Sequence, residues 1–182
     1  MSRRSSCLAA SLLTLGTGLI LLGGATSGAA QESTPMPTTL VEAARQATAA
    51  FQDPAAAEAA GYVHMQGCVS GPQEGAMGMH YVNVDLIDGE LDAAQPEILI
   101  YAPQDGAMQF VGVEYYVIAE DWAATHEGSP VLMGQLLNFT GAPNRYGDPP
   151  FFELHVWVGQ DNPNGMFADW NPTVSCDDAP AG

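Results

Sequence analysis

The segment Phe151-Phe152-Glu153-Leu154-His155-Val156-Trp157-Val158 shows the two-residue period of a β-strand more clearly than any other part of the chain. Side chains two positions apart in a strand point to the same face of the sheet. One face of this segment is wholly apolar: Phe152, Leu154, Val156 and Val158. The other face sets a carboxyl and an imidazole group between large aromatic rings: Phe151, Glu153, His155 and Trp157. The pattern predicts a strand with core on one side and titratable groups in an apolar setting on the other.

Further strands and the turns between them predict the fold class. The segments with strand composition are Met79–Leu86, Glu97–Ala102, Met108–Ala119 and, with a weaker pattern, Val131–Leu137. The turn signal Gln104-Asp105-Gly106 joins two of them in a hairpin. No helix-length segment alternates with the strands, which favours an antiparallel sheet. We expect an α+β fold in which N-terminal helices pack on a curved, barrel-like antiparallel sheet.

Two helices are predicted before the sheet. Thr39 and Glu42 have the spacing of a capping box, and apolar residues then recur at helical intervals. Asp53-Pro54 is typical of a second helix start, and Gly61 ends that helix. A short helix is predicted over Asp121–Glu127. Segments rich in glycine, proline or asparagine predict loops: Met65–Gly78, Asn138–Pro150 and Gln160–Cys176.

The first 30 residues have the organisation of a secretory signal peptide. Arg3 and Arg4 precede an apolar run from Leu8 to Leu22, and small residues lead to Ala30. That run is shorter than the about 20 residues of a membrane-spanning helix. We therefore expect a secreted or periplasmic protein with a signal peptide over residues 1–30 and a flexible lead-in over 31–37. One α+β domain over 38–176 and a disordered tail over 177–182 follow.

The charge balance of the chain is strongly acidic. Beyond residue 30 only Arg45 and Arg145 stand against 21 acidic residues, and lysine does not occur at all. Such a surface repels nucleic-acid phosphates and anionic lipid headgroups. The composition therefore argues against a nucleic-acid partner and against a membrane role beyond the signal peptide. It also excludes lysine-based covalent catalysis.

Cys68 and Cys176 are the two cysteines outside the predicted signal peptide. Two cysteines in an oxidising compartment usually pair. We expect a Cys68–Cys176 disulfide that ties the C-terminal end to a loop before the first strand. On the chain-entropy model, closing a loop of about 100 residues stabilises a fold by roughly 4–5 kcal/mol.

Titratable groups stand on three of the predicted strands, among apolar and aromatic neighbours: His80, Glu114, Glu153 and His155. If those faces line the inside of one barrel, the four side chains converge. Two imidazoles with one or two carboxylates suit a divalent transition metal, namely zinc, manganese or iron. Tyr81 or Tyr116, together with Trp157, would line the adjoining ligand pocket.

Three functions stay open for this set of residues. The first is an exported protein that binds a metal ion or a small ligand in a pocket lined by histidine, glutamate and aromatic side chains. The second is a metal-assisted hydrolase or oxygenase that uses the same pocket. The third is a structural or assembly protein in which these groups form a buried hydrogen-bonded network. The sequence contains neither a P-loop nor a Gly-x-Ser-x-Gly nucleophile motif to decide among them.

Several segments carry a resemblance to other proteins: Ala59–Tyr62, Gly75–Asn83, Pro96–Tyr101, Val111–Tyr116 and Leu154–Trp157, with Asn162-Pro163 and Cys176 after them. Together they resemble a group of uncharacterised exported bacterial proteins. The resemblance spans most of the chain beyond residue 30 and implies export and a bacterial origin. It implies no activity, but it places His80, Glu114 and His155 within the recurrent segments.

Overall fold

The computed structural model describes residues 37–179. The predicted signal peptide, residues 31–36 of the predicted lead-in and residues 180–182 of the predicted tail lie outside the described residues. Within 37–179, the helices are all too short or too polar to cross a bilayer.

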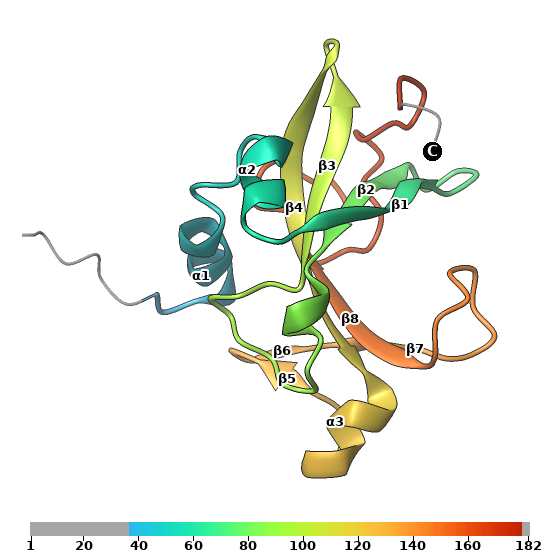
Figure 1. Ribbon diagram of the computed structural model, residues 1–182. Helices are drawn as coiled ribbons and strands as arrows, with labels where there is room; N and C mark the ends of the chain where they lie inside the picture. Colours follow the sequence, from blue (N-terminus) through green and yellow to red (C-terminus); the bar gives the residue numbers. More distant parts are fainter. Residues whose placement is uncertain (1–36, 180–182) are drawn as a thin grey trace, which may run out of the picture. The chain divides into compact units, whose positions relative to one another are not determined.

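The first two helices, α1 (Leu40–Ala47) and α2 (Pro54–Ala59), begin where the capping residues predict. The short helix predicted over Asp121–Glu127 is α3 (Ala119–Thr125), which begins two residues earlier and has no side-chain cap. At the start of α1, the Thr39 hydroxyl accepts the Glu42 N–H at 3.2 Å, and Glu42 Oε2 accepts the Thr39 N–H at 3.2 Å. Asp53 caps α2 by accepting the Ala55 N–H at 2.9 Å. The apolar sides of α1 and α2 pack against the sheet (Figure 1).

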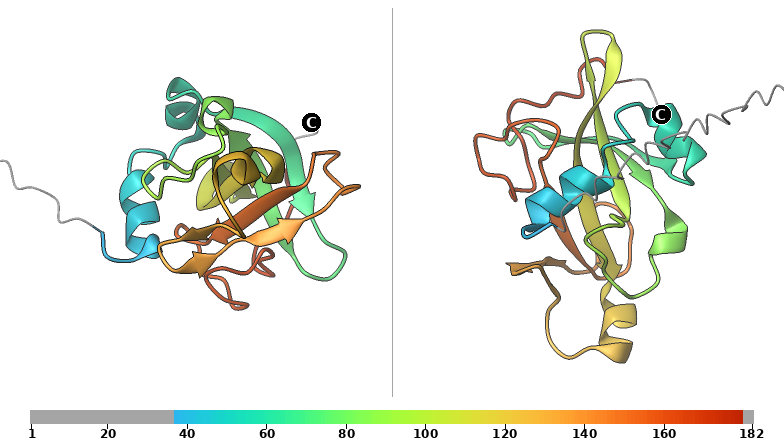
Figure 2. Two further views of the ribbon diagram at one scale, coloured as in Figure 1. Left: turned by 90° about the horizontal axis from the view of Figure 1, so that it is seen from below. Right: turned by 90° about the vertical axis from the view of Figure 1, so that its left-hand side faces the viewer.

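The sheet has six antiparallel strands in the order β1-β2-β3-β4-β8-β7. Their bounds are β1 (Val63–Ser70), β2 (Ala76–Val82), β3 (Ile98–Gln104), β4 (Ala107–Ile118), β8 (Phe151–Val156) and β7 (Asn138–Thr140). A separate hairpin is formed by β5 (Val131–Leu132) and β6 (Gln135–Leu136). The six-stranded sheet curls into a half-barrel (Figure 2). The predicted α+β fold, with helices on a curved antiparallel sheet, is confirmed.

Both faces of the sheet are buried. One face packs under the N-terminal helices, and we call it the helix-side face: Met79, Tyr81, Leu99, Tyr101, Val113, Tyr115, Leu154 and Val156. The opposite face packs under the C-terminal segment, which contributes Val174, and we call it the loop-side face: Val82, Ile98, Ile100, Val111, Tyr116, Phe151 and Trp157. The apolar face predicted for residues 152–158 therefore lies in the helix-side core, and its titratable face lies on the loop side.

Two strands occur in segments that were predicted as loops. β1 occupies the start of Met65–Gly78, where glycines obscured an edge strand whose side chains are mostly half-buried or exposed. β7 occupies the first three residues of Asn138–Pro150, also at a sheet edge. Edge strands bury little on one side, so their apolar period is weak and turn residues dominate the sequence pattern.

Turns interrupt two of the predicted strands. β2 stops at Val82 because Asn83 accepts the Asp85 N–H at 3.2 Å and caps a 3-10 helix, η1 (Val84–Leu86). The segment Val131–Leu137 is divided into β5 and β6 by a turn at Met133-Gly134, where φ is 46° and 86°. Both corrections arise from local turn chemistry that the apolar pattern does not record.

The structure contains the predicted Cys68–Cys176 disulfide, with Cα atoms 5.6 Å apart. Cys68 lies within β1 and not in a loop before the first strand, which corrects that part of the prediction. The bond therefore fastens the C-terminal segment to an edge strand of the sheet. That segment covers the loop-side face, so the disulfide helps to enclose the groups on it.

Candidate metal centre

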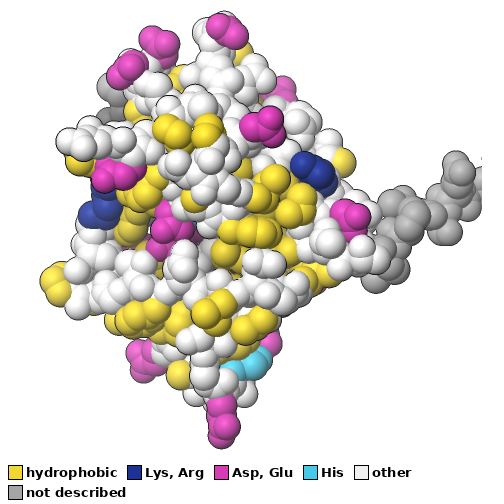
Figure 3. All heavy atoms as spheres, turned by 180° about the vertical axis from the view of Figure 1, so that it is seen from behind, with side chains coloured by type: hydrophobic (Ala, Val, Ile, Leu, Met, Phe, Trp, Pro, Cys, Tyr) yellow, Lys and Arg dark blue, Asp and Glu magenta, His cyan; other side chains and the backbone are white. Residues whose placement is uncertain are grey.

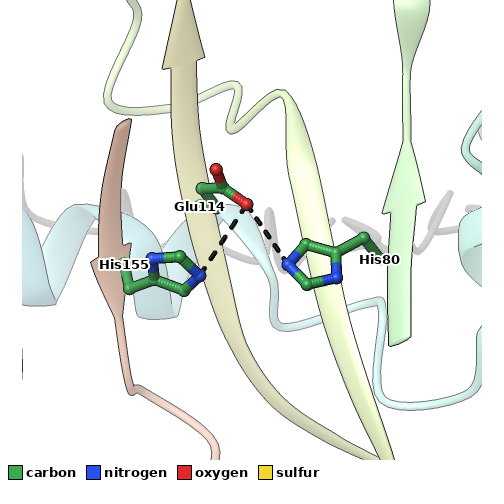
Figure 4. Close-up of side chains that lie close together, drawn as sticks. All are labelled: His80, Glu114 and His155. Atoms are coloured by element: carbon green, nitrogen blue, oxygen red, sulfur yellow. Dashed lines mark ion pairs between the residues drawn. The ribbon is translucent and has the colours of Figure 1, made fainter. Parts of the chain in front are cut away.

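Three strands direct their titratable side chains to one place on the loop-side face. His80 is on β2, Glu114 on β4 and His155 on β8. Glu114 lies directly opposite His155 in the register of β4 and β8. β3 separates His80 from Glu114, so their backbones would be about 9–10 Å apart in a flat sheet. The three side chains nevertheless point toward one another, across Ile98 and Ile100 of β3 (Figure 4).

The donor atoms of these side chains form one compact group. Glu114 Oε2 lies 3.4 Å from His80 Nε2 and 3.8 Å from His155 Nε2. One ligand atom from each residue lies within 4.8 Å of the others. Ligand atoms about 2.0–2.2 Å from a tetrahedral zinc ion are roughly 3.3–3.6 Å apart. The group therefore fits a metal ion with small side-chain adjustments.

The group is almost fully enclosed by protein. His80 and Glu114 are each 4% exposed, and His155 is 1% exposed. Among the atoms of residues 37–179, His80 Nδ1 and both ring nitrogens of His155 have no hydrogen-bond partner. A buried polar atom left unpaired costs about 1–3 kcal/mol. A bound cation would give His155 Nε2 a partner.

Burial sets the protonation of the group. Desolvation lowers the pKa of His80 from 6.5 to about 4 and the pKa of His155 to about 3. Desolvation also raises the pKa of Glu114 from 4.5 to about 8. At neutral pH the imidazoles are therefore unprotonated, as metal ligation requires, and the carboxyl group of the metal-free protein is largely protonated. The close contacts in Figure 4 join neutral groups, and a cation that binds there displaces the proton of Glu114.

Glu153, the fourth predicted ligand, lies beside this group. It is opposite Tyr116 in the register of β4 and β8, two residues along each strand from the Glu114–His155 pair and on the same face of the sheet. The Thr140 hydroxyl donates to Glu153 Oε1 at 2.6 Å. Desolvation and then repulsion from Glu114 raise the pKa of Glu153 to about 8. In the described part of the chain, the three-donor group does not include Glu153, which supplies a second carboxyl group next to it.

A cavity of about 310 Å³ opens beside the three donors. His80 and Glu114 belong to its wall, together with Tyr116 and Glu153, whereas His155 is not among the lining residues. A metal ion on the three donors would therefore meet the cavity on its His80 and Glu114 side. Zinc sites with three protein ligands keep a fourth position for a water molecule or substrate. The arrangement has the form of an open metal site.

The C-terminal segment places a carboxyl group near the second ring nitrogen of His155, beyond hydrogen-bond distance. Asp169 Oδ1 lies 3.8 Å from His155 Nδ1, and the Asn138 side-chain amide donates to the same Asp169 oxygen at 3.2 Å. Metal-binding histidines commonly direct their second ring nitrogen to a carboxylate, which fixes the tautomer and the ring orientation. Asp169 stands where such a group is needed for an ion on His155 Nε2.

The three aromatic residues predicted for the ligand pocket lie in different places. Tyr116 lines the cavity. Tyr81 lies on the helix-side face, with its ring 4.9 Å from Tyr101, because consecutive strand residues point to opposite faces. Its expected place in the pocket with His80 is thus corrected. Trp157 is buried beside His155, with ring centroids 6.4 Å apart, and its Nε1–H donates to the Ala168 carbonyl at 2.6 Å. It anchors the C-terminal segment and is outside the cavity wall.

Two glycines allow the strands to approach closely around the ligands. Gly78 precedes His80 by two positions and has a φ of 111°; a Cβ atom there would lie 2.6 Å from the Tyr101 carbonyl oxygen. Gly112 precedes Glu114 by two positions, and a Cβ atom there would lie 2.7 Å from the Val156 carbonyl oxygen. Larger residues at either position would displace backbone next to a ligand.

Sequence reasoning missed three polar neighbours of the donor group: Thr140, Asp148 and Asp169. They lie in or next to segments predicted as loops, between strands or after the last one. A loop carries no periodic signal that says which face of a sheet it covers. Only the cysteine pairing indicated that the C-terminal segment returns to the sheet.

Comparisons of the chain with protein-family models, curated proteins and solved structures find no match. Function is therefore inferred from the donor atoms, their burial and the cavity beside them. Two imidazole nitrogens and one carboxylate oxygen form a donor set that holds divalent transition metals in proteins.

Proposed function

We propose that this is an exported protein that binds one divalent transition-metal ion through His80, Glu114 and His155. The observation that carries the proposal is the convergence of two unprotonated imidazoles and one carboxyl group in a buried site. Zinc, manganese and iron(II) all accept these ligands. The Cys68–Cys176 disulfide supports an oxidising compartment, because such bonds persist mainly outside the cytosol.

A purely structural hydrogen-bonded network accounts less well for the same residues. In such a network nearly every buried ring nitrogen has a partner. Here three ring nitrogens of His80 and His155 lack one among the described residues. Desolvation also disfavours the charged form of each histidine, so no ion pair with Glu114 compensates for the burial in the metal-free protein. A metal ion on the two Nε2 atoms supplies a partner for one of these three nitrogens, His155 Nε2, and a positive charge that ionised Glu114 would balance.

The cavity favours a second candidate function, a metal-assisted hydrolase or oxygenase that uses the same site. Glu153 lines the cavity, and its pKa of about 8 lies in the range in which a carboxyl group exchanges protons near neutral pH. An enzyme of this kind would turn over a substrate in the metal-loaded state. Its Glu153→Gln variant would lose turnover while it kept the metal, whereas a binding protein would show no turnover in either form.

Metal content tests the proposal directly. Purified protein would be stripped with a chelator, loaded separately with Zn²⁺, Mn²⁺, Fe²⁺ and Co²⁺, and desalted before elemental analysis. We expect one ion per chain for at least one of these metals, and visible absorption from the Co²⁺ form. His80→Ala and His155→Ala should retain no stoichiometric ion, because each change removes a nitrogen ligand.

His126→Ala is the matched control for this experiment. His126 also lies close to a glutamate, with Nε2 3.5 Å from Glu90 Oε2, but both side chains are partly or largely exposed. The variant should bind metal like the wild type. Wild-type protein that keeps none of the four metals would overturn the proposal, and so would a wild-type stoichiometry in the His80→Ala/His155→Ala double variant.

A further inference from the structure

The cavity beside the three donors has a chemical character of its own. Its wall contains three carboxyl groups, those of Glu114, Asp148 and Glu153, and neither lysine nor arginine lines it in the described part of the chain. The remaining wall is mainly apolar and aromatic. Figure 3 shows acidic side chains spread over a whole face of the molecule, including in a recess between hydrophobic side chains.

We propose that this cavity binds a small organic cation: a primary amine carried on an apolar or aromatic body. The inference rests on the proposed function, because the ligand would share His80 and Glu114 with the metal ion. In the metal-free protein burial keeps Glu114 and Glu153 largely protonated, so the wall offers an ammonium group the oxygens of two neutral carboxyl groups and of Asp148 as acceptors. Arg145 lies outside this wall, with Cζ 5.9 Å from the ring centroid of Tyr146, and its guanidinium donates to the Ser70 carbonyl at 3.0 Å.

The apolar part of the wall suits the body of such a ligand. Val82 and Ile98 contribute aliphatic surface from β2 and β3. The ring of Phe151 lies 4.7 Å from that of Tyr116 and 6.1 Å from that of Tyr146, so three aromatic rings cluster along one part of the wall. Burial of apolar surface supplies affinity, and aromatic faces attract cations. A volume of about 310 Å³ is at the lower end of small-ligand cavities, which limits the body to about one ring.

The acceptors for the ammonium group are held in place by their neighbours. Thr140 fixes one oxygen of Glu153 through its hydroxyl. The backbone at Asp148 is fixed by Asn144, whose side chain accepts the Asp148 N–H at 3.2 Å and donates to its carbonyl at 2.9 Å. His80, 4% exposed and with Nδ1 unpartnered, adds a buried polar side chain to the same wall. Groups that are ordered before binding cost less entropy when the ligand arrives.

Three probes of one shape test the charge preference: phenethylamine, 2-phenylethanol and 3-phenylpropanoate. Each carries a phenylethyl group, and they end in an ammonium, a hydroxyl and a carboxylate group. Affinities would be measured by calorimetry at one pH and ionic strength, with metal-free protein and with protein whose metal content is known. We expect phenethylamine to bind at least ten-fold more tightly than 2-phenylethanol, and 3-phenylpropanoate to bind more weakly than either to metal-free protein.

Asp148→Asn and Asp105→Asn make a matched pair of variants for the same titrations. Asp148→Asn keeps the shape of the wall, removes one charge, and should weaken phenethylamine about ten-fold while 2-phenylethanol changes less than three-fold. Asp105 lies in the exposed β3–β4 turn, far along the chain from the cavity wall, so Asp105→Asn should change neither affinity. Phenethylamine that binds no better than 2-phenylethanol, or a tighter 3-phenylpropanoate complex with metal-free protein, would overturn the inference. Metal content is measured separately from amine affinity. A protein that binds the amine but no metal would therefore contradict the proposed metal-binding function and leave the amine inference intact.

Discussion

His80 and Glu114 form one histidine–glutamate contact in this protein, and His126 and Glu90 form another. The nitrogen–oxygen distances are 3.4 Å and 3.5 Å. The side chains of the first pair are each 5% exposed, whereas those of the second are 32% and 62% exposed. By distance the two contacts are almost the same, and by environment they are opposites.

The surroundings explain why only one of the two pairs is a candidate metal centre. His126 stacks on Trp122 with ring centroids 3.7 Å apart, and its Nδ1 lies 2.9 Å from the Thr125 hydroxyl. Its ring therefore has local partners at the end of a short helix. His80 and Glu114 instead come from different strands, meet a second histidine and share a wall with a cavity. The candidate metal centre therefore differs from the surface contact by its burial and by its third donor, and not by the nitrogen–oxygen distance of the pair.

The largest expected difference between the pairs is in stabilisation by a metal ion. Zn²⁺ at about 100 times its dissociation constant should raise the free energy of unfolding of the wild type by about 2.7 kcal/mol, because the ion binds only the folded state. His155→Ala should lose this gain, and His126→Ala should keep it. Denaturant unfolding with and without Zn²⁺ measures the effect. Equal losses in the two variants would show that the surface pair is as much a metal site as the buried one.

The pH dependence of the metal-free protein should also separate the pairs. The folded-state pKa of Glu114 is raised, so its contribution to stability is complete below pH 4.5 and is lost as the pH rises toward about 8. The folded-state pKa values of His80 and His155 are lowered, so their contribution is complete above pH 6.5 and is lost as the pH falls toward about 3–4. Between pH 6.5 and 8 only the carboxyl effect acts, and stability should fall.

Glu114→Gln tests the origin of that slope. Each proton that only the folded state holds lowers the free energy of unfolding by about 1.4 kcal/mol per pH unit as the pH rises. Between pH 6.5 and 8, the free energy of unfolding of Glu114→Gln should therefore fall less steeply than that of the wild type, by up to this amount per pH unit. Glu153 and Glu97, whose pKa values are also raised to about 8 by burial, keep part of the slope. Glu90→Gln is the surface control. If Glu114→Gln and Glu90→Gln reduced the pH dependence of the free energy of unfolding equally, burial would not be the cause of the pH dependence.

The sequence predicted the buried pair better than it predicted the pair's surroundings. Glu153 and His155 stand in a strand with a clear two-residue period, so their shared direction could be derived from alternation. The strands of His80 and Glu114 are buried on both faces, and there a polar residue among apolar neighbours was the only signal. The convergence of these side chains could not be derived, because strand order and curl depend on contacts between distant segments. Nothing in the sequence placed Asp148 and Asp169 beside these residues, since both lie in irregular segments. The cavity could not be predicted for the same reason: its wall combines β1, η1 and the segment after β7.

A smaller difference between the buried and the exposed histidine is expected from the residue beside the Nδ1 atom of each, which is Asp169 for His155. It lies 3.8 Å from His155 Nδ1, whereas Thr125 occupies the corresponding place beside His126 Nδ1. Asp169→Asn should lower metal affinity about ten-fold, the lower end of the range for such supporting carboxylates. Thr125→Val should leave metal affinity unchanged. Competition with a coloured chelator measures both, and rescue by Asp169→Glu would separate a role in orienting His155 from a loss of folding. An unchanged affinity in Asp169→Asn would remove this residue from the site.

The smallest expected effect concerns the surface pair itself. A double-mutant cycle with His126→Ala and Glu90→Gln should give a coupling free energy below about 1 kcal/mol, because water screens exposed charges and two mobile side chains lose entropy when they meet. Urea unfolding at pH 6 and low salt measures it, and added salt should reduce it further. A coupling above about 2 kcal/mol would mean that the Trp122 ring shields this pair enough to act like a buried one. In that case exposure would not explain why the two contacts differ, and the distinction would rest on the second histidine alone.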